Sequence, residues 1–359
     1  MQVKNITEAD VAGKRVLVRC DFDVPLKDGK VVDATRLKAA VPTIEFLKQK
    51  STAQIILIGH VGRPEGVVVE ELRTAPIAAA LATLTDMQGV EVKENLRFDA
   101  REEANDPAFA QELAALADLF VNESFATAHR AHASTVGVAK LLPSYAGLHF
   151  ALEVAKLSSA LTPPQGAIAI IGGAKFETKQ PLIEKLLATY SKVLVGGALG
   201  NDFIKARGWP FGNSLVSSVP VPTAIASNDN ILSPQDAYFM GGSLDGRSGP
   251  VTDTRADEKI VDIGPLTAAM WSNEITKAPF VLWNGPMGVY EAGYTQSTDA
   301  LAGALVSSNI PAIIGGGDTT AAVSKFTFDQ EKIFISSGRG AMLEFLANGT
   351  LPTLEVLNG

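Results

Sequence analysis

A single cysteine, Cys20, occurs among the 359 residues, so no intrachain disulfide and no cysteine-based zinc site can form. No apolar run approaches the roughly 20 residues needed to span a bilayer, and the start MQVKNITEAD lacks the apolar segment of a secretory signal. We therefore expect a cytoplasmic protein without a membrane partner. Basic residues are in the minority, 31 against 39 acidic ones, and the net charge of −8 argues against nucleic acid as the main partner.

Two common nucleotide-binding signatures are also missing. No G-x-x-x-x-G-K-[ST] stretch is present, which excludes a P-loop enzyme, and no G-x-G-x-x-G follows the first apolar run, as a dinucleotide-binding fold would require. Hydrophobic residues make up 46% of the chain and charged residues 19%, a composition typical of folded globular proteins. Taking about 150 residues as one domain, the length predicts two domains.

Short apolar runs alternate with helical patterns along the chain, which is typical of buried parallel strands in an α/β fold. The predicted strands are residues 15–20, 54–58, 117–121, 167–171, 192–195, 280–283, 311–314 and 332–335. The predicted helices are residues 35–50, 72–84, 107–116, 266–277, 297–307 and 319–326. Residues 217–258 are rich in Ser, Pro, Asp and Gly and predict a loop-rich excursion.

The domain boundary is predicted near the stretch ALEVAKLSSALTPPQG. Its helical pattern ends in Thr162-Pro163-Pro164, and a proline pair makes a stiff helix stop. This gives a first lobe over residues 1–150, a linker helix over 151–165 and a second lobe from residue 166.

Glycines follow five apolar runs of the second lobe. They are Gly172-Gly173, Gly196-Gly197, Gly285, Gly315-Gly316-Gly317 and Gly338. At the carboxyl ends of parallel strands glycine lets backbone N–H groups approach phosphates closely, so this lobe predicts a nucleotide site. Glycine that only makes tight turns would explain one such loop more readily than five.

The loop GGGDTTAAVSKF runs directly into a helical pattern, whose N-terminus would present unpaired N–H groups to a phosphate. Asp318 in this loop is read as an N-cap, as a ligand of a phosphate-bound magnesium ion, or as both. Lys175 and Lys179 in GGAKFETK follow a glycine pair and suit the charge of transferring phosphoryl oxygens. Without the glycines, two lysines four residues apart would indicate a solvated helix face.

The first lobe instead carries basic side chains that border apolar runs or turns. These are Arg36, His60, Arg63, Arg97, His129, Arg130 and His132. Arginine forks bind carboxylate and phosphate groups bidentately, so a focused cationic pocket in an acidic protein predicts a small polyanionic ligand. Taken singly, Arg36 also suits a surface salt bridge, Asp33 an ordinary helix cap and His132 a core histidine.

Eight blocks of the sequence occur in the order found in phosphoglycerate kinases and resemble that family between Lys14 and Leu357. The blocks are VLVRCDFDVPL, GHVGRP, ENLRF, VNESFATAHRAHAST, GGAKFETK, WNGPMGVYE, GGGDT and SSGRGAMLE. The resemblance implies two Rossmann-like three-layer α/β/α lobes with mainly parallel sheets, joined by a hinge helix. It also implies a C-terminal lobe over 166–340 and a segment over 341–359 that packs back on the N-terminal lobe.

The resemblance further implies a monomer that moves a phosphoryl group between 1,3-bisphosphoglycerate and ADP, giving 3-phosphoglycerate and ATP, with Mg²⁺. Residues expected around 3-phosphoglycerate are Asp21, Asp23, Arg36, His60, Arg63, Arg97, His129 and Arg130. Residues expected to line the nucleotide are Lys175, Lys179, Asn284, Glu291, Gly315, Gly316, Gly317, Asp318 and Thr319, with Asp318 near the metal. Arg36, Lys175 and Lys179 are the expected catalytic residues.

Three departures from the family stand out. Asp23 occupies the place of a usual Asn, and in the loop SSGRG Arg339 replaces a glycine and Ser337 a threonine. The chain is also short for the family, with segments missing between Gly66 and Lys93 and between Leu215 and Ile260. Two alternative readings remain. The first is a relative that acts on a different small carboxylate, and the second is a relative that only binds ligands. Retention of the lysines and arginines argues against the second.

Overall fold

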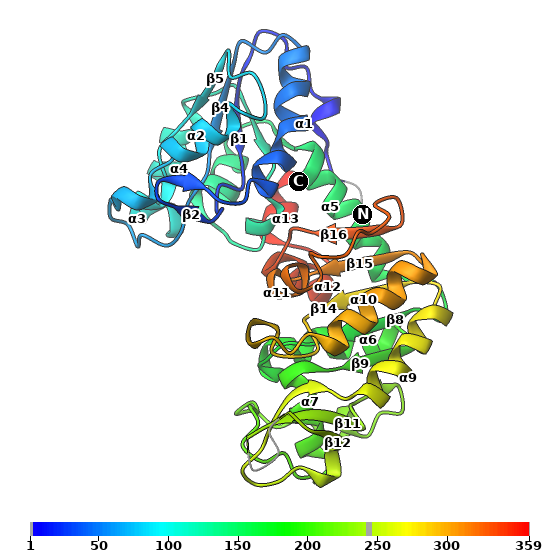
Figure 1. The fold of residues 1–359 in the computed structure, drawn as a ribbon. Coiled ribbons are helices and arrows are strands. Elements are labelled where there is room, and N and C mark those ends of the chain that lie inside the picture. Colours follow the sequence, from blue (N-terminus) through cyan, green and yellow to red (C-terminus); the bar gives the residue numbers. More distant parts are fainter. Residues whose placement is uncertain (1–2, 242–245, 359) are drawn as a thin grey trace. The chain divides into compact units, whose positions relative to one another are not determined.

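A computed structural model describes residues 3–241 and 246–358. The chain divides into two compact units, Met1–Ala155 with Asn348–Gly359, and Lys156–Ala347. Each has its own sheet and core, and both belong to the α/β class (Figure 1). Within the described residues no helix is long and apolar enough to cross a membrane.

The first unit is built on a five-stranded parallel sheet in the order β5-β4-β1-β6-β7. Its strands are β1 (Arg15–Arg19), β4 (Gln54–Ile58), β5 (Val90–Val92), β6 (Leu119–Asn122) and β7 (Ser144–Ala146). A hairpin of β2 (Leu26–Lys27) and β3 (Lys30–Val31) follows β1. The chain begins in the middle of the sheet, builds one half and then returns to build the other. In open α/β sheets ligands bind where the strand order reverses, which here is at the carboxyl ends of β1 and β6.

Helices cover both faces of this sheet, because alternate residues of each strand enter different cores. Val16 and Val18 pack with α1 and α2, whereas Leu17 packs with α4 and with Val356 of α13. The helices are α1 (Thr35–Gln49), α2 (Ala75–Leu81), α3 (Ala100–Glu103), α4 (Pro107–Ala114) and α13 (Pro352–Asn358). Helix α13, from the far end of the sequence, contacts β7 and the one-turn helices η5 (Ala133–Gly137) and η6 (Val138–Lys140).

Helix α5 (Leu148–Leu161) carries the chain from the first unit into the second, since the division falls after Ala155. The second division falls after Ala347, near the end of α12 (Gly340–Asn348). The contacts therefore assign residues 341–347 to the second unit and residues 348–358 to the first.

The second unit contains a six-stranded parallel sheet in the order β10-β9-β8-β14-β15-β16. Numbered within the sheet, this is the 3-2-1-4-5-6 order of Rossmann folds, in which ligands bind where the order reverses, here between β8 and β14. The strands are β8 (Ile168–Ile171), β9 (Lys192–Val195), β10 (Ile231–Leu232), β14 (Val281–Asn284), β15 (Ala312–Gly315) and β16 (Ile333–Ser336). The helices are α6 (Phe176–Thr189), α7 (Gly197–Ala206), α8 (Thr223–Ala226), α9 (Pro265–Lys277), α10 (Gln296–Ser308), α11 (Gly317–Ala322) and α12.

The loop-rich prediction for residues 217–258 is wrong in part. The structure places β11 (Asp236–Met240) and β12 (Ser248–Pro250) there, paired antiparallel with β13 (Lys259–Ile263) on the other side of β11. The small core of this three-stranded sheet contains Ala237, Phe239 and Val251. Residues 242–245 of the predicted stretch lie outside the described residues. β12 consists of Ser, Gly and Pro and has no apolar run that could identify it as a strand.

Two predicted helices also differ from the structure in extent. The predicted helix 72–84 is only α2, because Glu70–Leu72 form a separate 3₁₀ turn and Thr74 precedes the first helical residue. The predicted helix 319–326 is α11, which begins two residues earlier. Gly316 there has φ +100°, and this turn starts the helix inside the triple glycine.

Candidate active site

In the first unit, Arg36 is held between the two carboxylates that follow β1. Its Nη1 lies 3.2 Å from Asp21 Oδ2 and 3.7 Å from Asp23 Oδ2, and it donates to the Asp23 carbonyl at 2.7 Å. Burial raises the pKa of Asp21, and Arg36 is the largest influence opposing it. The Arg36 side chain is only 13% exposed, so this is a partly buried ion pair rather than a surface one.

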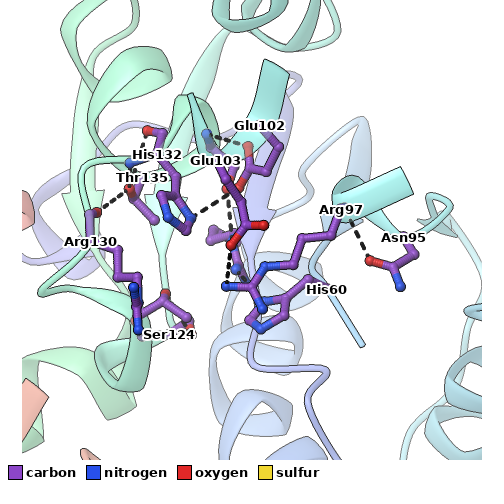
Figure 2. A network of polar contacts seen from close by, with 12 residues as sticks. His60, Asn95, Arg97, Glu102, Glu103, Ser124, Arg130, His132 and Thr135 are labelled. Carbon is purple, nitrogen blue, oxygen red and sulfur yellow. Dashed lines mark hydrogen bonds and ion pairs between the residues drawn. The ribbon is translucent and has the colours of Figure 1, made fainter. Parts of the chain in front are cut away.

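Gly62 connects this group to Arg97. The Gly62 N–H donates to Asp23 Oδ1 at 3.0 Å, and the Gly62 carbonyl accepts from Arg97 Nη1 at 2.9 Å. Arg97 also pairs with Glu103 at 3.1 Å, as Figure 2 shows. Arg97 Nε and His129 Nδ1 are both buried, and neither has a hydrogen-bond partner among the described residues. Buried polar atoms are normally satisfied, so both atoms favour a polar ligand.

His60 is buried at the end of β4, and its Nδ1 lies 2.9 Å from Arg19 Nη2. An arginine can only donate, so Nδ1 is the acceptor and neutral His60 carries its proton on Nε2. Burial and then Arg19 and Arg97 hold the pKa of His60 well below its usual range. His60 is therefore a neutral donor at physiological pH.

Figure 2 shows His132 and Arg130 in the same cluster as Arg97 and His60. Burial, followed by the neighbouring Arg97, lowers the pKa of His132 to about 4, and burial followed by Arg130 lowers that of His129. His132 is buried, as the core-histidine reading expects, and its Nδ1 lies 3.8 Å from the buried Glu102. The arginines of this cluster add to burial in keeping the histidines neutral, and positive charge concentrated in this way favours an anionic ligand.

The remaining predicted residue, Arg63, is exposed and forms no ion pair with the residues that the structure describes. Sequence reasoning in turn missed Arg19, which is fully buried and donates to Ser134 Oγ at 3.0 Å. Ser134 also donates to Glu102 at 2.5 Å. A charged residue ending the apolar run RVLVR was the available signal.

In the second unit, several glycines after the strands are closely packed. Gly172 and Gly285 pack backbone against backbone, since a Cβ on Gly172 would lie 2.3 Å from the Pro286 carbonyl oxygen. Gly315 is likewise buried, against Met342. Gly316 and Gly317 line an open cavity, and Gly285 lines it as well. The tight-packing reading therefore holds for several glycines, and ligand binding by those that line the cavity stays a prediction.

This cavity, which we call the phosphate cavity, has a volume of about 620 Å³. Thr319 and Asn284 form its buried floor: Thr319 Oγ1 accepts from the Gly285 N–H at 2.6 Å, and Asn284 Nδ2 donates to the Gly315 carbonyl at 2.9 Å. Its full lining is Gly173, Ala174, Lys179, Asn284, Gly285, Pro286, Gly316, Gly317, Asp318, Thr319, Arg339, Gly340 and Leu343. The charged members are two cations and one carboxylate.

Lys179 is the buried cation of the phosphate cavity. Its ammonium group donates to the Gly172 carbonyl, and burial lowers its pKa to about 8 against the opposing charge of Asp318. Lys175 is exposed and begins α6 in the left-handed conformation, with φ +66°. It does not line the cavity, although its neighbour Ala174 does.

A second cavity of about 330 Å³, which we call the base cavity, adjoins the first. The two share Gly173, Ala174, Pro286 and Asp318. Further lining includes Ile260, Val261, Met287, Tyr290 and Glu291. Apolar side chains with a few polar groups suit a nucleoside.

Asp318 is exposed in the first turn of α11 and caps no N–H group there, so the N-cap reading is wrong. No group of three or more His, Cys, Asp or Glu side chains able to hold a metal ion occurs in the described parts of the chain. Mg²⁺ in phosphate sites takes one or two carboxylates and completes its shell with phosphates and water. A lone carboxylate between two cavities fits that requirement.

The second unit has the Rossmann strand order, and the first has the order 3-2-1-4-5. One unit carries a cationic cluster and the other a glycine-lined cavity. These features define a class of protein: a two-unit α/β protein for small anionic ligands.

Comparison with known proteins agrees with that class. A family model described as phosphoglycerate kinase matches residues 6–93 and 85–349. The phosphoglycerate kinase of Roseiflexus sp. strain RS-1 is 40% identical over 394 residues and covers all of both chains. That of Maricaulis maris is 39% identical, covering 100% of this chain and 98% of its own.

Two solved structures are also similar. Phosphoglycerate kinase from Coxiella burnetii has a TM-score of 0.86 at 33% identity, and that from Pyrococcus horikoshii OT3 has 0.84 at 27%. Each match covers 99% of this chain and 98% of the other. The chain belongs to the phosphoglycerate kinase family. It is an enzyme of that class, a kinase with a carboxyl group as acceptor.

Proposed function

We propose that the chain catalyses reversible phosphoryl transfer between 1,3-bisphosphoglycerate and ADP, giving 3-phosphoglycerate and ATP. The observation that carries this is the glycine-lined, cation-containing phosphate cavity in a chain that belongs to this family over its full length. The phosphate cavity and base cavity bind ADP or ATP in the second unit, which is the nucleotide lobe. The cationic cluster binds 3-phosphoglycerate in the first unit.

In the first unit, 3-phosphoglycerate is held by the cations and neutral histidines of the cluster. Arg97 Nε and His129 Nδ1, two of the buried side-chain atoms that have no partner among the described residues, bind its oxygen atoms. Asp23 remains compatible with an anionic substrate, because Arg36 and the Gly62 N–H already hold its carboxylate. The complete substrate set is Asp21, Asp23, Arg36, His60, Arg63, Arg97, His129 and Arg130.

In the second unit, the N-terminal turn of α11 and Lys179 bind the nucleotide phosphates, and Glu291 lies at the ribose. The nucleotide set also includes Asn284, Gly315, Gly316, Gly317 and Thr319. Asp318 is the residue that would hold a nucleotide-bound Mg²⁺, which neutralises phosphate charge when bound.

Transfer forms a bond from an ADP β-phosphate oxygen to phosphorus and breaks the bond from phosphorus to the acyl oxygen, which leaves as a carboxylate. Both oxygens are anionic, so no general base is required. The protein must instead supply positive charge, from Arg36 and Lys175, and exclude water. Since the two ligands must meet, the proposal includes a hinge motion at α5, the helix shared by both units.

The proposal also covers the setting of the enzyme. We propose a cytoplasmic monomer whose partners are its small-molecule substrates and not nucleic acid, with the net charge of −8 as support. A kinase for another small carboxylate is the second candidate, and the carboxylate of Asp23 beside the substrate cluster is what favours it.

A coupled assay of the purified protein with ATP, Mg²⁺ and 3-phosphoglycerate tests the proposal, beside a panel of other small carboxylates. Magnesium-dependent turnover with 3-phosphoglycerate as the best acceptor supports it. Turnover with a different carboxylate alone would transfer the assignment to the second candidate. Nucleotide binding without turnover on any acceptor would contradict both.

The pH dependence of nucleotide binding tests Lys179. With its pKa at about 8, Lys179 is mostly charged at pH 7 and mostly neutral at pH 9, so ADP affinity should fall between these values. The ADP phosphates change little in charge over this range, because their last pKa is about 6 and they are already roughly nine-tenths ionised at pH 7. Calorimetry without added metal would measure the fall. Lys179→Arg, charged at both pH values, should leave only the smaller fall caused by ionisation of Asp262 in the base cavity, whose pKa burial raises to about 7. An equal fall in that variant would contradict the assignment.

A further inference from the structure

Arg339 is a second cation in the wall of the phosphate cavity, besides Lys179. It lies in the loop between β16 and α12. A Cβ placed on Gly317 would lie 3.8 Å from Arg339 Nε, so the guanidinium stands beside the backbone of the first turn of α11. Gly316, Gly317, Asp318 and Thr319, at the start of α11, line the same cavity.

The backbone of Arg339 adopts a conformation that favours glycine, with φ +47°. Among the described non-glycine residues with positive φ, only Lys175 and Arg339 are cations, and each lies in a loop that follows a strand of the same sheet. The others are Asp28, Ser51, Glu65, Asn105 and Asn309. A strained conformation retained beside a ligand cavity indicates that the side chain has a function there.

The two cavities indicate how a nucleotide would be oriented. With the nucleoside in the base cavity, its phosphates would extend past the residues that both cavities share, including Gly173 and Asp318, into the phosphate cavity. Arg339 lines the phosphate cavity but not the base cavity. It is therefore placed to meet a phosphate rather than the ribose.

We propose that Arg339 is a specificity-determining residue that binds the terminal phosphate of ATP and so favours the triphosphate over the diphosphate. The inference rests on the proposed nucleotide site. A guanidinium donates two parallel N–H groups to one phosphate, and of these nucleotides ATP has the phosphate chain that extends furthest from the base. Arg339 therefore contributes more to ATP binding than to ADP binding.

Calorimetric binding of ATP, ADP and AMP with Mg²⁺ to the full chain tests this, in the wild type, Arg339→Gly and Arg339→Lys. Losing a bidentate charged contact should weaken ATP binding about tenfold in Arg339→Gly. ADP binding should weaken about threefold at most and AMP binding should not change. Arg339→Lys keeps the charge without the fork and should fall between the two.

Asn309→Gly is the matched control, because it also removes a left-handed non-glycine residue from the second unit, at φ +49°. It should leave all three affinities unchanged. Arg339→Gly should melt no lower than the wild type, because glycine relieves the strain. Equal losses for ATP and ADP, or none, would overturn the inference but not the nucleotide site. A wild type that binds none of the three would overturn the proposed function as well.

Discussion

Replacing Arg36 with alanine should lower kcat by about a hundredfold or more, a magnitude typical of removing one preorganised donor from a transition state. Arg36 is the cation nearest the two carboxylates after β1, and in the proposed mechanism it stabilises charge on the transferring group. Turnover should fall far more than stability. Burial already raises the pKa of Asp21, so this carboxyl can take up a proton once its partner is lost.

Steady-state kinetics and thermal melting of Arg36→Ala would measure the two effects. Arg15→Ala is the control, because Arg15 also pairs with an aspartate, Asp118 at 2.8 Å, but both side chains are more than 40% exposed. It should change neither quantity appreciably. Near-normal turnover in Arg36→Ala, or a collapse of the fold that accounts for the lost activity, would remove Arg36 from the catalytic residues.

The parallel sheets were predictable because their strands are buried on both faces. Such strands read as continuous apolar runs, and the predicted bounds of β4 and β9 agree with the structure residue for residue. The shorter strands β5 and β7 were missed. Each has three residues and lies at an edge of its sheet, so it has too few apolar positions for a recognisable run.

Side-chain partners were less predictable than strands. The sequence shows that Arg36 and Asp23 lie near turns, but only the folded chain shows that Gly62 connects Asp23 to Arg97. Glu102 and Arg19 are buried charges more than 80 positions apart in sequence, and each opposes the pKa shift that burial causes in the other. No local pattern encodes such a pairing, because it depends on how α3 docks against β1.

Glycine was similarly ambiguous at the sequence level. Glycine allows two strand ends to pack closely at Gly172, whereas at Gly316 it lines the phosphate cavity. Which role applies depends on the neighbour that a Cβ would meet, and that neighbour comes from another strand. The five-loop pattern predicted the place of the cavity but could not assign a role to each glycine.

Replacing Lys175 with alanine should reduce kcat about a hundredfold or more while changing ADP affinity little. Lys175 is exposed at the start of α6 and lies outside the cavity lining, unlike Lys179. A contact made mainly as the phosphoryl group transfers lowers turnover without lowering ground-state binding. Stopped-flow or coupled kinetics together with calorimetric ADP binding would separate the two.

The backbone at Lys175 requires its own control, because alanine at φ +66° remains strained whereas glycine does not. Lys175→Gly should therefore melt higher than Lys175→Ala and be equally inactive, which assigns the loss to the missing ammonium group. Lys185→Ala, exposed on the same helix, should keep full turnover. If Lys175→Gly recovered activity, loop strain rather than lost charge would explain the alanine variant. Lys179 and Arg339, the two cations that line the phosphate cavity, would then neutralise the transferring phosphate.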